Sequence, residues 1–309
     1  MARGYVLALV AFAALWGANF AFIKIAVRQI EPSTMGAARL LLAAAALFPV
    51  ALVRYGLAET IAGVRRIGWR LLLLGTLNHS AAFLLIAWGE KHIDSGVAAI
   101  ANATVPLFVA LLAIRWSQSE RASGLRLVGI AVGMVGVGVL TGFHPEGGTW
   151  AILGTLAVVL AAVVYSIAGL YTQSRYAGTP PLVLAVCSTT GGGLVLLPAA
   201  IVQAPSSMPD AGPLGATIAL GLAGTAAASI LYYHLLTTYG SLRTGFATYV
   251  LPIVAVGYGA AFLGESLSWS AAIGLALILA GVALGSGLLR RRRAEPAGPI
   301  VAAERNAGR

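Results

Sequence analysis

Two prolines stand inside apolar segments, and each leaves a backbone carbonyl without its usual partner. Pro106 has no N–H to donate to the carbonyl of Asn102, and Pro252 has none for that of Thr248. In an apolar environment such acceptors persist only where protein or a water-filled cavity serves them. Because Asn102 and Thr248 also carry polar side chains, we interpret the prolines as kinks or gating points beside a solute-binding cavity. The alternative is a packing kink satisfied by a neighbouring helix.

A histidine and an asparagine lie side by side in another apolar segment. His79 is at the centre of residues 69–89, next to Asn78. Ionisable groups inside such segments are candidates for function, and the unperturbed pKa of histidine, about 6.5, suits proton transfer. We therefore expect both residues to contact a substrate, and His79 to bind the proton if protons drive the process. A hydrogen bond within a helix interface is the alternative role for His79.

Aromatic side chains with polar tips accompany these groups. Trp16 and Asn19 are three positions apart, which places them on roughly one face of a helix. A cavity with aromatic faces and a few polar groups suits amphipathic organic solutes. Aromatic residues near helix ends have a competing interpretation as interfacial anchors. The residues expected to contact a substrate are Trp16, Asn19, Asn78, His79, Asn102, Tyr165, Tyr233, Thr248 and Tyr249.

The elements that position these residues follow from the composition. Hydrophobic residues make up 59% of the 309 residues and charged residues 10%, whereas soluble domains carry about 25% charged residues. A helix of about 20 apolar residues spans the hydrocarbon core of a bilayer. We therefore predict an all-α integral membrane protein with ten transmembrane helices. The predicted spans are 5–27, 33–53, 69–89, 95–115, 124–141, 150–172, 181–203, 213–236, 243–263 and 268–288.

The net charge of +10 marks orientation rather than a nucleic-acid ligand. Most basic residues fall in alternate connections, and connections rich in Lys and Arg stay on the cytoplasmic side. We therefore expect a multi-pass protein of the plasma (inner) membrane with both termini in the cytoplasm. The arginines assigned to that side are Arg3, Arg54, Arg65, Arg66, Arg70, Arg115, Arg121, Arg126, Arg175, Arg243 and Arg290 to Arg293.

The two halves of the chain repeat one another. Trp16 and Tyr165 are 149 positions apart in matching segments, and Pro106 and Pro252 are 146 positions apart. Loop insertions produce such a small drift in offset. Prolines at consistent offsets are harder to attribute to chance than matches of Gly, Ala and Leu.

An odd number of spans in each half makes the second copy cross the membrane in the opposite direction. Inverted repeats of this kind place a substrate site between them, near the midplane. We assign residues 1–142 to the first five-helix repeat and residues 143–289 to the second. Residues 290–309 are a basic tail without periodicity, expected to be disordered and cytoplasmic.

Three motifs resemble those of the EamA-type drug/metabolite transporter superfamily. They are WGANFAFIK at residues 16–24, Arg39 in AARLLLAAAALFP, and a twice-occurring proline followed by glutamate after 13 or 14 residues and glycine nine residues later. The first copy reads RWSQSE where the family usually has LGE. The resemblance implies a ten-helix inverted-repeat carrier, often an exporter or exchanger of amino acids or other small organic metabolites. Nucleotide-sugar or other anionic carriers of the same superfamily are the alternative.

By this assignment, all ten acidic residues fall in loops, at helix ends or in the tail. Glu90 and Asp210 are expected to be peripheral, and Glu120 and Glu265 to terminate helices. No carboxylate is therefore expected at the substrate site. Arg39 lies about two turns into its span, and we expect it to have a structural partner rather than to contact an anionic substrate.

No catalytic or nucleotide-binding motif occurs, so we expect no enzyme, no cofactor and no metal site. The single Cys187 excludes an internal disulfide. A channel or a non-transporting sensor is the alternative to a carrier. The expected partners are a small-molecule substrate and the lipid bilayer. The pairs Gly129/Gly133 and Gly281/Gly285 predict close helix packing, within one chain or in a homodimer.

Overall fold

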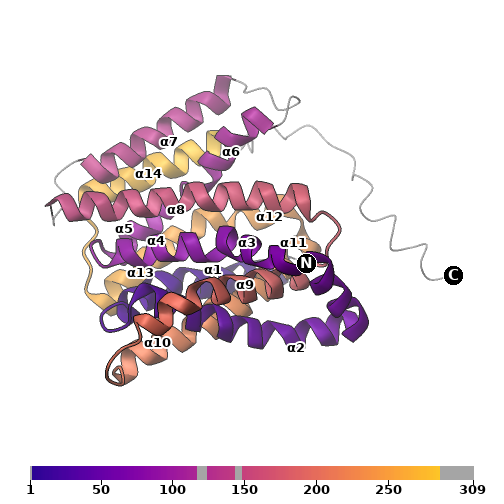
Figure 1. The fold of residues 1–309 in the computed structure, drawn as a ribbon. Coiled ribbons are helices and arrows are strands. Elements are labelled where there is room, and N and C mark those ends of the chain that lie inside the picture. The colour runs from indigo at the N-terminus through magenta and orange to yellow at the C-terminus, as the bar shows by residue number, and fades with distance from the viewer. Residues whose placement is uncertain (1, 117–123, 143–147, 286–309) are drawn as a thin grey trace.

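The computed structural model describes residues 2–116, 124–142 and 148–285, and within them it contains helices and no strands (Figure 1). Glu120 and the tail of residues 290–309 lie outside the described residues. The helices are α1 (Ala2–Ala26), α2 (Pro32–Ile67), η1 (Gly68–Arg70), α3 (Leu71–Gly75), η2 (Thr76–Ser80), α4 (Ala81–Glu90), α5 (Ser95–Asn102), α6 (Val105–Trp116), α7 (Gly124–Gly142), α8 (Gly148–Arg175), α9 (Pro181–Val202), α10 (Ala211–Gly221), η3 (Leu222–Ala227), α11 (Ala228–Tyr239), α12 (Ser241–Gly245), α13 (Ala247–Leu263) and α14 (Trp269–Gly285).

The predicted class, an all-α membrane protein, is confirmed. Seven helical stretches of the described residues are long and apolar enough to cross a membrane, and two shorter apolar helices accompany them. The longest stretch, Pro32–Glu90, has 59 residues, far more than the roughly 20 that one crossing needs. Gly56 and Gly68 have positive φ angles of 80° and 55° inside it, so we interpret it as two crossings. The total of ten crossings stays a prediction.

Equivalent helices of the two halves make equivalent contacts. Helix α1 packs against α10 and α13 of the second half, and α8, its counterpart, packs against α4 and α5 of the first. Likewise α3 packs against α9, and α10 packs against α2. The pairs α2 with α9 and α7 with α14 join equivalent helices directly. This arrangement is the one expected when the repeats are related by a pseudo-two-fold axis.

Each half contains a π-helical turn at the same place. The turn η2 begins at Thr76 and η3 at Leu222, 146 positions later, which is the offset that also relates Pro106 to Pro252. Single π turns inside α-helices alter the backbone hydrogen bonding and often mark functional positions. Side chains serve the carbonyls beside both turns: Asn78 Nδ2 donates to Leu74 O at 3.0 Å, and Thr225 Oγ1 donates to Leu220 O at 2.8 Å.

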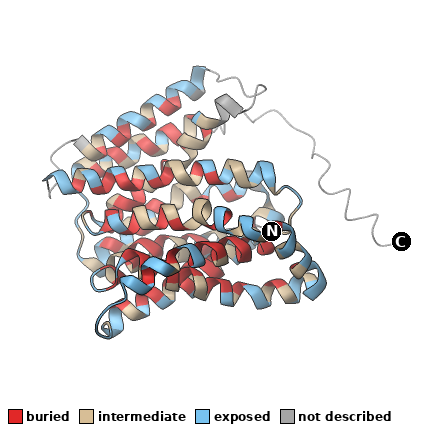
Figure 2. Cartoon of the chain, viewed as in Figure 1, coloured by how far each residue is buried: buried red, intermediate tan, exposed pale blue. Residues whose placement is uncertain are grey.

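Helices α7 and α14 lie side by side at one edge of the molecule (Figure 1). Glycines allow this contact, because a Cβ added to Gly281 would lie 2.5 Å from Gly133 N and 2.6 Å from Gly129 O. The glycine pairs of the sequence therefore pack helices within one chain. Elsewhere, apolar side chains face outward, as with Val53 at 90% exposure, and buried residues concentrate where helices face each other (Figure 2).

We predict that Gly281→Ala lowers the stability of the purified protein in detergent, because its methyl group has no room against α7. Overpacking of this kind costs about 1–3 kcal/mol, which thermal unfolding measures as a lower midpoint. Gly138→Ala is the matched control on α7, since open space surrounds that glycine. Equal midpoints for the two variants would contradict the α7–α14 packing.

Candidate functional site

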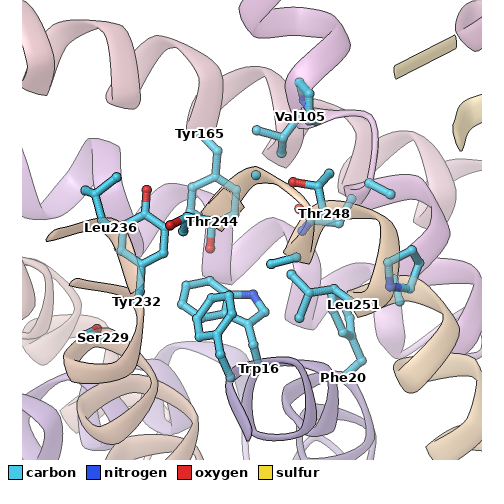
Figure 3. A pocket seen from close by; sticks show the side chains of 18 of the residues that line it. Trp16, Phe20, Val105, Tyr165, Ser229, Tyr232, Leu236, Thr244, Thr248 and Leu251 are labelled. Atoms are coloured by element: carbon cyan, nitrogen blue, oxygen red, sulfur yellow. The ribbon is translucent and has the colours of Figure 1, made fainter. Parts of the chain in front are cut away.

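A cavity of about 460 Å³ lies between the two halves. Its residues come from both repeats, and Figure 3 shows Trp16 and Phe20 of α1 facing Tyr165 of α8 and Thr248 of α13. The lining residues are Phe12, Trp16, Phe20, Asn78, His79, Ala99, Asn102, Ala103, Val105, Pro106, Tyr165, Ser229, Tyr232, Tyr233, Leu236, Thr244, Gly245, Ala247, Thr248, Leu251 and Pro252.

The cavity extends from mid-helix toward the end of the molecule where the chain begins, which we call the N-terminal end. Phe12 lies in the first half of α1, Leu236 in the last turn of α11, and Thr244 in the short helix α12 that follows. The opposite end, called the far end, holds the connections 27–31, 91–94, 203–210 and 264–268. None of these connections contributes to the described cavity lining.

Most of the residues predicted for the site meet in this cavity. The structure brings together Trp16, Asn78, His79, Asn102, Pro106, Tyr165, Tyr233, Thr248 and Pro252. That these side chains contact a substrate stays a prediction. Their convergence has a simple cause, because helices that lie far apart in the sequence occupy equivalent positions around the axis between the repeats.

Two predicted residues do not line the cavity. Asn19 is 4% exposed and its Nδ2 donates to Gly224 O at 3.0 Å, which joins α1 to the π turn η3. Asn19 can approach this closely because residue 224 is a glycine, where an added Cβ would collide with Asn19 Oδ1. Tyr249 packs against the main apolar core, with its hydroxyl buried. Asn19 shares a helical face with Trp16, as predicted, but its side chain bonds to the backbone of a neighbouring helix instead of lining the cavity.

The two prolines differ in their local structure. Pro252 stands inside α13, as predicted. Pro106 stands in the first turn of α6, because α5 ends at Asn102 and α6 begins at Val105, with a two-residue turn between them. Helices α5 and α6 together form one membrane-length stretch, Ser95–Leu112, which is interrupted next to Pro106; the gating role of Pro106 stays a prediction. A first-turn proline forgoes no helical bond, and the break puts the Asn102 side chain beside the cavity with its Oδ1 buried and without a hydrogen-bond partner among the described residues.

His79 lies on the π turn η2 at the cavity wall. Its Nε2 is 3.1 Å from Ser188 Oγ of α9, and its ring centroid is 5.3 Å from that of Phe83. Its Nδ1 is buried and has no hydrogen-bond partner among the described residues. The contact with Ser188 is the helix-interface role considered from the sequence. The ring also borders the cavity, and its contact with a substrate or a proton stays a prediction.

Arg39 occupies the position in α2 that corresponds to Ser188 in α9, at an offset of 149. Its Nε donates to Thr225 Oγ1 at 2.8 Å, and its guanidinium lies 3.8 Å from the centroid of the Phe83 ring. Thr225 in turn corresponds to His79, at an offset of 146. The same contact between a helix and a π turn is therefore built twice with different chemistry. The expectation of a structural partner for Arg39 is confirmed.

Sequence reasoning missed several aromatic lining residues. Phe12 and Phe20 lie four positions before and after Trp16, so a search for one helical face would have found both. Tyr232 directly precedes Tyr233, and both line the cavity because α11 turns only part of a revolution between them. The sequence carries no comparable signal for Ser229 or Thr244, whose places depend on how α11 and α12 pack.

Contacts between the halves gather at the far end. Gln29 bonds to the carboxylate of Asp210, and Ser33 Oγ donates to Gln203 Oε1 at 2.6 Å. Glu265 accepts hydrogen bonds from Ser95 N at 2.9 Å and Ser95 Oγ at 2.7 Å, at the first turn of α5. Glu265 thus bonds at the start of α5, in the other half, whereas the sequence predicted a role at the end of its own helix.

The expectation that every acidic residue is peripheral was wrong for Glu90. Its side chain is fully buried at 0% exposure, although it ends helix α4. The last turn of α4 is covered by α1 and α8, so a helix end that looked exposed in the sequence lies inside the protein. Asp210, in contrast, is exposed as expected.

We predict that Asn19→Ala lowers the thermal stability of the purified protein, because it leaves Gly224 O buried without its donor. An unsatisfied buried group of this kind costs about 1–3 kcal/mol. Asn102→Ala is the matched control, since its Oδ1 accepts no hydrogen bond from the described residues. If the control destabilises the protein as much as Asn19→Ala, the distinction between the two asparagines is wrong.

Comparisons with known proteins agree with this architecture. An archaeal protein described as an uncharacterized transporter, from Archaeoglobus fulgidus, is 27% identical over 292 residues, covering 91% of this chain and 98% of the relative. The uncharacterized inner membrane transporter YedA of Escherichia coli strain K12 is 28% identical, covering 96% and 94%. A probable terminal-alkyne amino-acid exporter of Streptantibioticus cattleyicolor is 29% identical, covering 95% and 97%.

The fold is also found among solved structures. One crystal structure matches with a TM-score of 0.65 at 20% identity, covering 94% of this chain and 99% of that chain. The sequence profile of the EamA-like transporter family matches twice, at residues 2–142 and 152–287, so that it accounts for nearly the whole chain in two copies. The protein is a membrane transporter that belongs to the EamA-like transporter family.

Proposed function

We propose that this transporter exports or exchanges small organic solutes such as amino acids by alternating access. The observation that carries the proposal is a cavity shared by the two repeats and confined to one end, while hydrogen bonds between the repeats close the other end. A carrier must expose one site to the two sides in turn, and inverted repeats provide two equivalent conformations for doing so.

The cavity chemistry favours neutral or zwitterionic amphipathic solutes. A volume of about 460 Å³ is within the range of small-molecule sites. Aromatic rings line it together with the amides of Asn78 and Asn102 and the hydroxyl of Thr248. None of the described lining residues is Asp, Glu, Lys or Arg. The amino-acid exporter among the relatives supports the same substrate class.

This chemistry disfavours the alternative of a nucleotide-sugar carrier. Phosphate groups are bound by Arg or Lys in most protein sites. Arg39 is a cation inside a predicted span that could bind such a group. Its guanidinium instead contacts Thr225 and the Phe83 ring, and Arg39 is not among the lining residues.

A channel differs from a carrier in its kinetics rather than in its lining, because saturable flux with counterflow requires a carrier.

We predict that Asn102→Leu weakens transport by removing the amide at the cavity wall. The solute is first chosen by a thermal-shift screen of amino acids, amines and aromatic metabolites, and counterflow is then measured in proteoliposomes. Loss of one hydrogen bond of about 1.4 kcal/mol raises the half-saturation concentration about tenfold. Ser206→Ala, at an exposed position, is the control with unchanged transport. Wild-type affinity and rate in Asn102→Leu would contradict the proposed site.

We also propose that both termini are cytoplasmic, which makes the cavity face the cytoplasm and the far end face outward. Single cysteines at Ser207 and Ala58, both exposed positions, test this in a Cys187→Ala background. A membrane-impermeant thiol reagent added to intact cells is expected to label Ser207→Cys and spare Ala58→Cys, while both react in permeabilised cells. Labelling of Ala58→Cys alone would reverse the orientation.

A further inference from the structure

Glu90 is a buried carboxyl that transport by the central cavity does not use. It is 0% exposed, and neither Oε1 nor Oε2 has a hydrogen-bond partner among the described residues. It lies near the far end, outside the described cavity lining. A buried carboxylate without hydrogen bonds is costly, so a carboxyl in this environment is expected to hold its proton.

The charged groups around Glu90 have other partners. Lys24 of α1 donates to the backbone carbonyls of Glu90 and Ile93, at 2.8 and 2.6 Å. Arg39 of α2 and Glu265, after α13, bind the partners already described. Helix α5 and the turns of α8 around Gly154, which contact α4, carry no ionisable side chain. In the connection that follows Glu90, Lys91 is paired with Glu31 and His92 stacks on Trp150 of α8. Glu90 is thus the member of this group without a bonded partner.

The repeat gives Glu90 a counterpart in the cavity. Three pairs of matching positions are 146 residues apart: the starts of η2 and η3, the starts of α5 and α12, and the two prolines, Pro106 and Pro252. Glu90 lies between these landmarks, and the same offset pairs it with Leu236. Leu236 lines the open cavity at the N-terminal end. When the repeats exchange conformations, Glu90 takes the place that Leu236 has now.

We propose that Glu90 is a proton-binding site that titrates as the far end opens and closes. With the far end closed, as in this structure, the carboxyl is neutral and sealed from water. When the far end opens, Glu90 lines a water-filled cavity, its O–H bond ionises, and the proton passes to water on that side. Closing takes up one proton from the same side. This inference rests on the proposed alternating-access function.

The consequence is a pH dependence of the far-end opening. The open state binds one proton fewer than the closed state, so raising the pH on that side favours opening. One proton released shifts the ratio of open to closed molecules by up to about tenfold per pH unit. Leu236, at the counterpart position, has no ionisable group, so it gives the opening of the N-terminal end no corresponding pH dependence.

Thiol labelling at Ile86 tests the proposal without knowledge of the substrate. Ile86 is 4% exposed and corresponds at the same offset to Tyr232, which lines the cavity. In the Cys187→Ala background, Ile86→Cys is labelled from the far side in proteoliposomes by an impermeant reagent between about pH 5.5 and about pH 8. The rate is divided by that of Ser207→Cys, an exposed loop position on the same side, which removes the effect of pH on the thiol itself.

We expect this ratio to rise with pH in the parent, and to be low and independent of pH in Glu90→Gln. Glu90→Leu, which introduces the residue of the counterpart position, should give the same result and guards against an effect particular to glutamine. Glu31→Gln is the carboxyl control and should keep the pH dependence, because Glu31 is exposed at the same end and its ion pair with Lys91 lies within the first repeat. Gel filtration confirms that each variant is folded.

A ratio that does not change with pH in the parent would overturn the proposal, as would a pH dependence that survives in Glu90→Gln or disappears in Glu31→Gln. All of these outcomes leave the transport proposal intact. Absence of Ile86→Cys labelling at every pH, with normal Ser207→Cys labelling, would instead overturn alternating access and the proton site together.

Discussion

The structure depends on one constraint: inside a membrane, a polar group must find its partner within the protein. Several polar residues of this chain meet it at the contacts between the repeats. Asn19 bonds to the backbone of η3, Asn78 bonds to Thr172 of α8, and Arg39 bonds to Thr225. Such contacts hold helices together where apolar packing against lipid tails offers no preference for a neighbour.

The repeats share a scaffold while their chemistry differs. Both have a π turn at the same position, and each turn receives a polar contact from the second helix of the other half. In one case the contact is Arg39 with Thr225, and in the other it is Ser188 with His79. A scaffold with equivalent backbone positions can be symmetric in its two conformations while the groups exposed in each conformation are different.

Side chains at paired positions make the two ends of the molecule chemically different. The cavity at the N-terminal end is bordered by neutral polar and aromatic groups, and its wall includes Leu236. The counterpart of that wall contains Glu90, now buried at the far end. In the proposed alternating-access mechanism, repeat symmetry makes the two openings geometrically alike, so any difference between the two sides has to come from side chains at paired positions such as these.

The sequence alone determined the class of the protein, the division into repeats and most of its polar cavity residues. Composition requires helices in a membrane, and prolines and aromatic residues at equivalent positions lie around a common axis, so Trp16, Tyr165, Asn102 and Thr248 could be named in advance. These inferences depend on local order and periodicity, which the sequence records directly.

Only the tertiary structure decided which polar groups face the cavity and which serve another helix. Asn19 shares a helical face with Trp16 but bonds to Gly224, 205 positions away in the chain. Glu90 ends its helix as a surface residue would, yet neighbouring helices bury it completely. Burial and pairing are properties of neighbours brought together by folding, and no local pattern in the sequence specifies those neighbours.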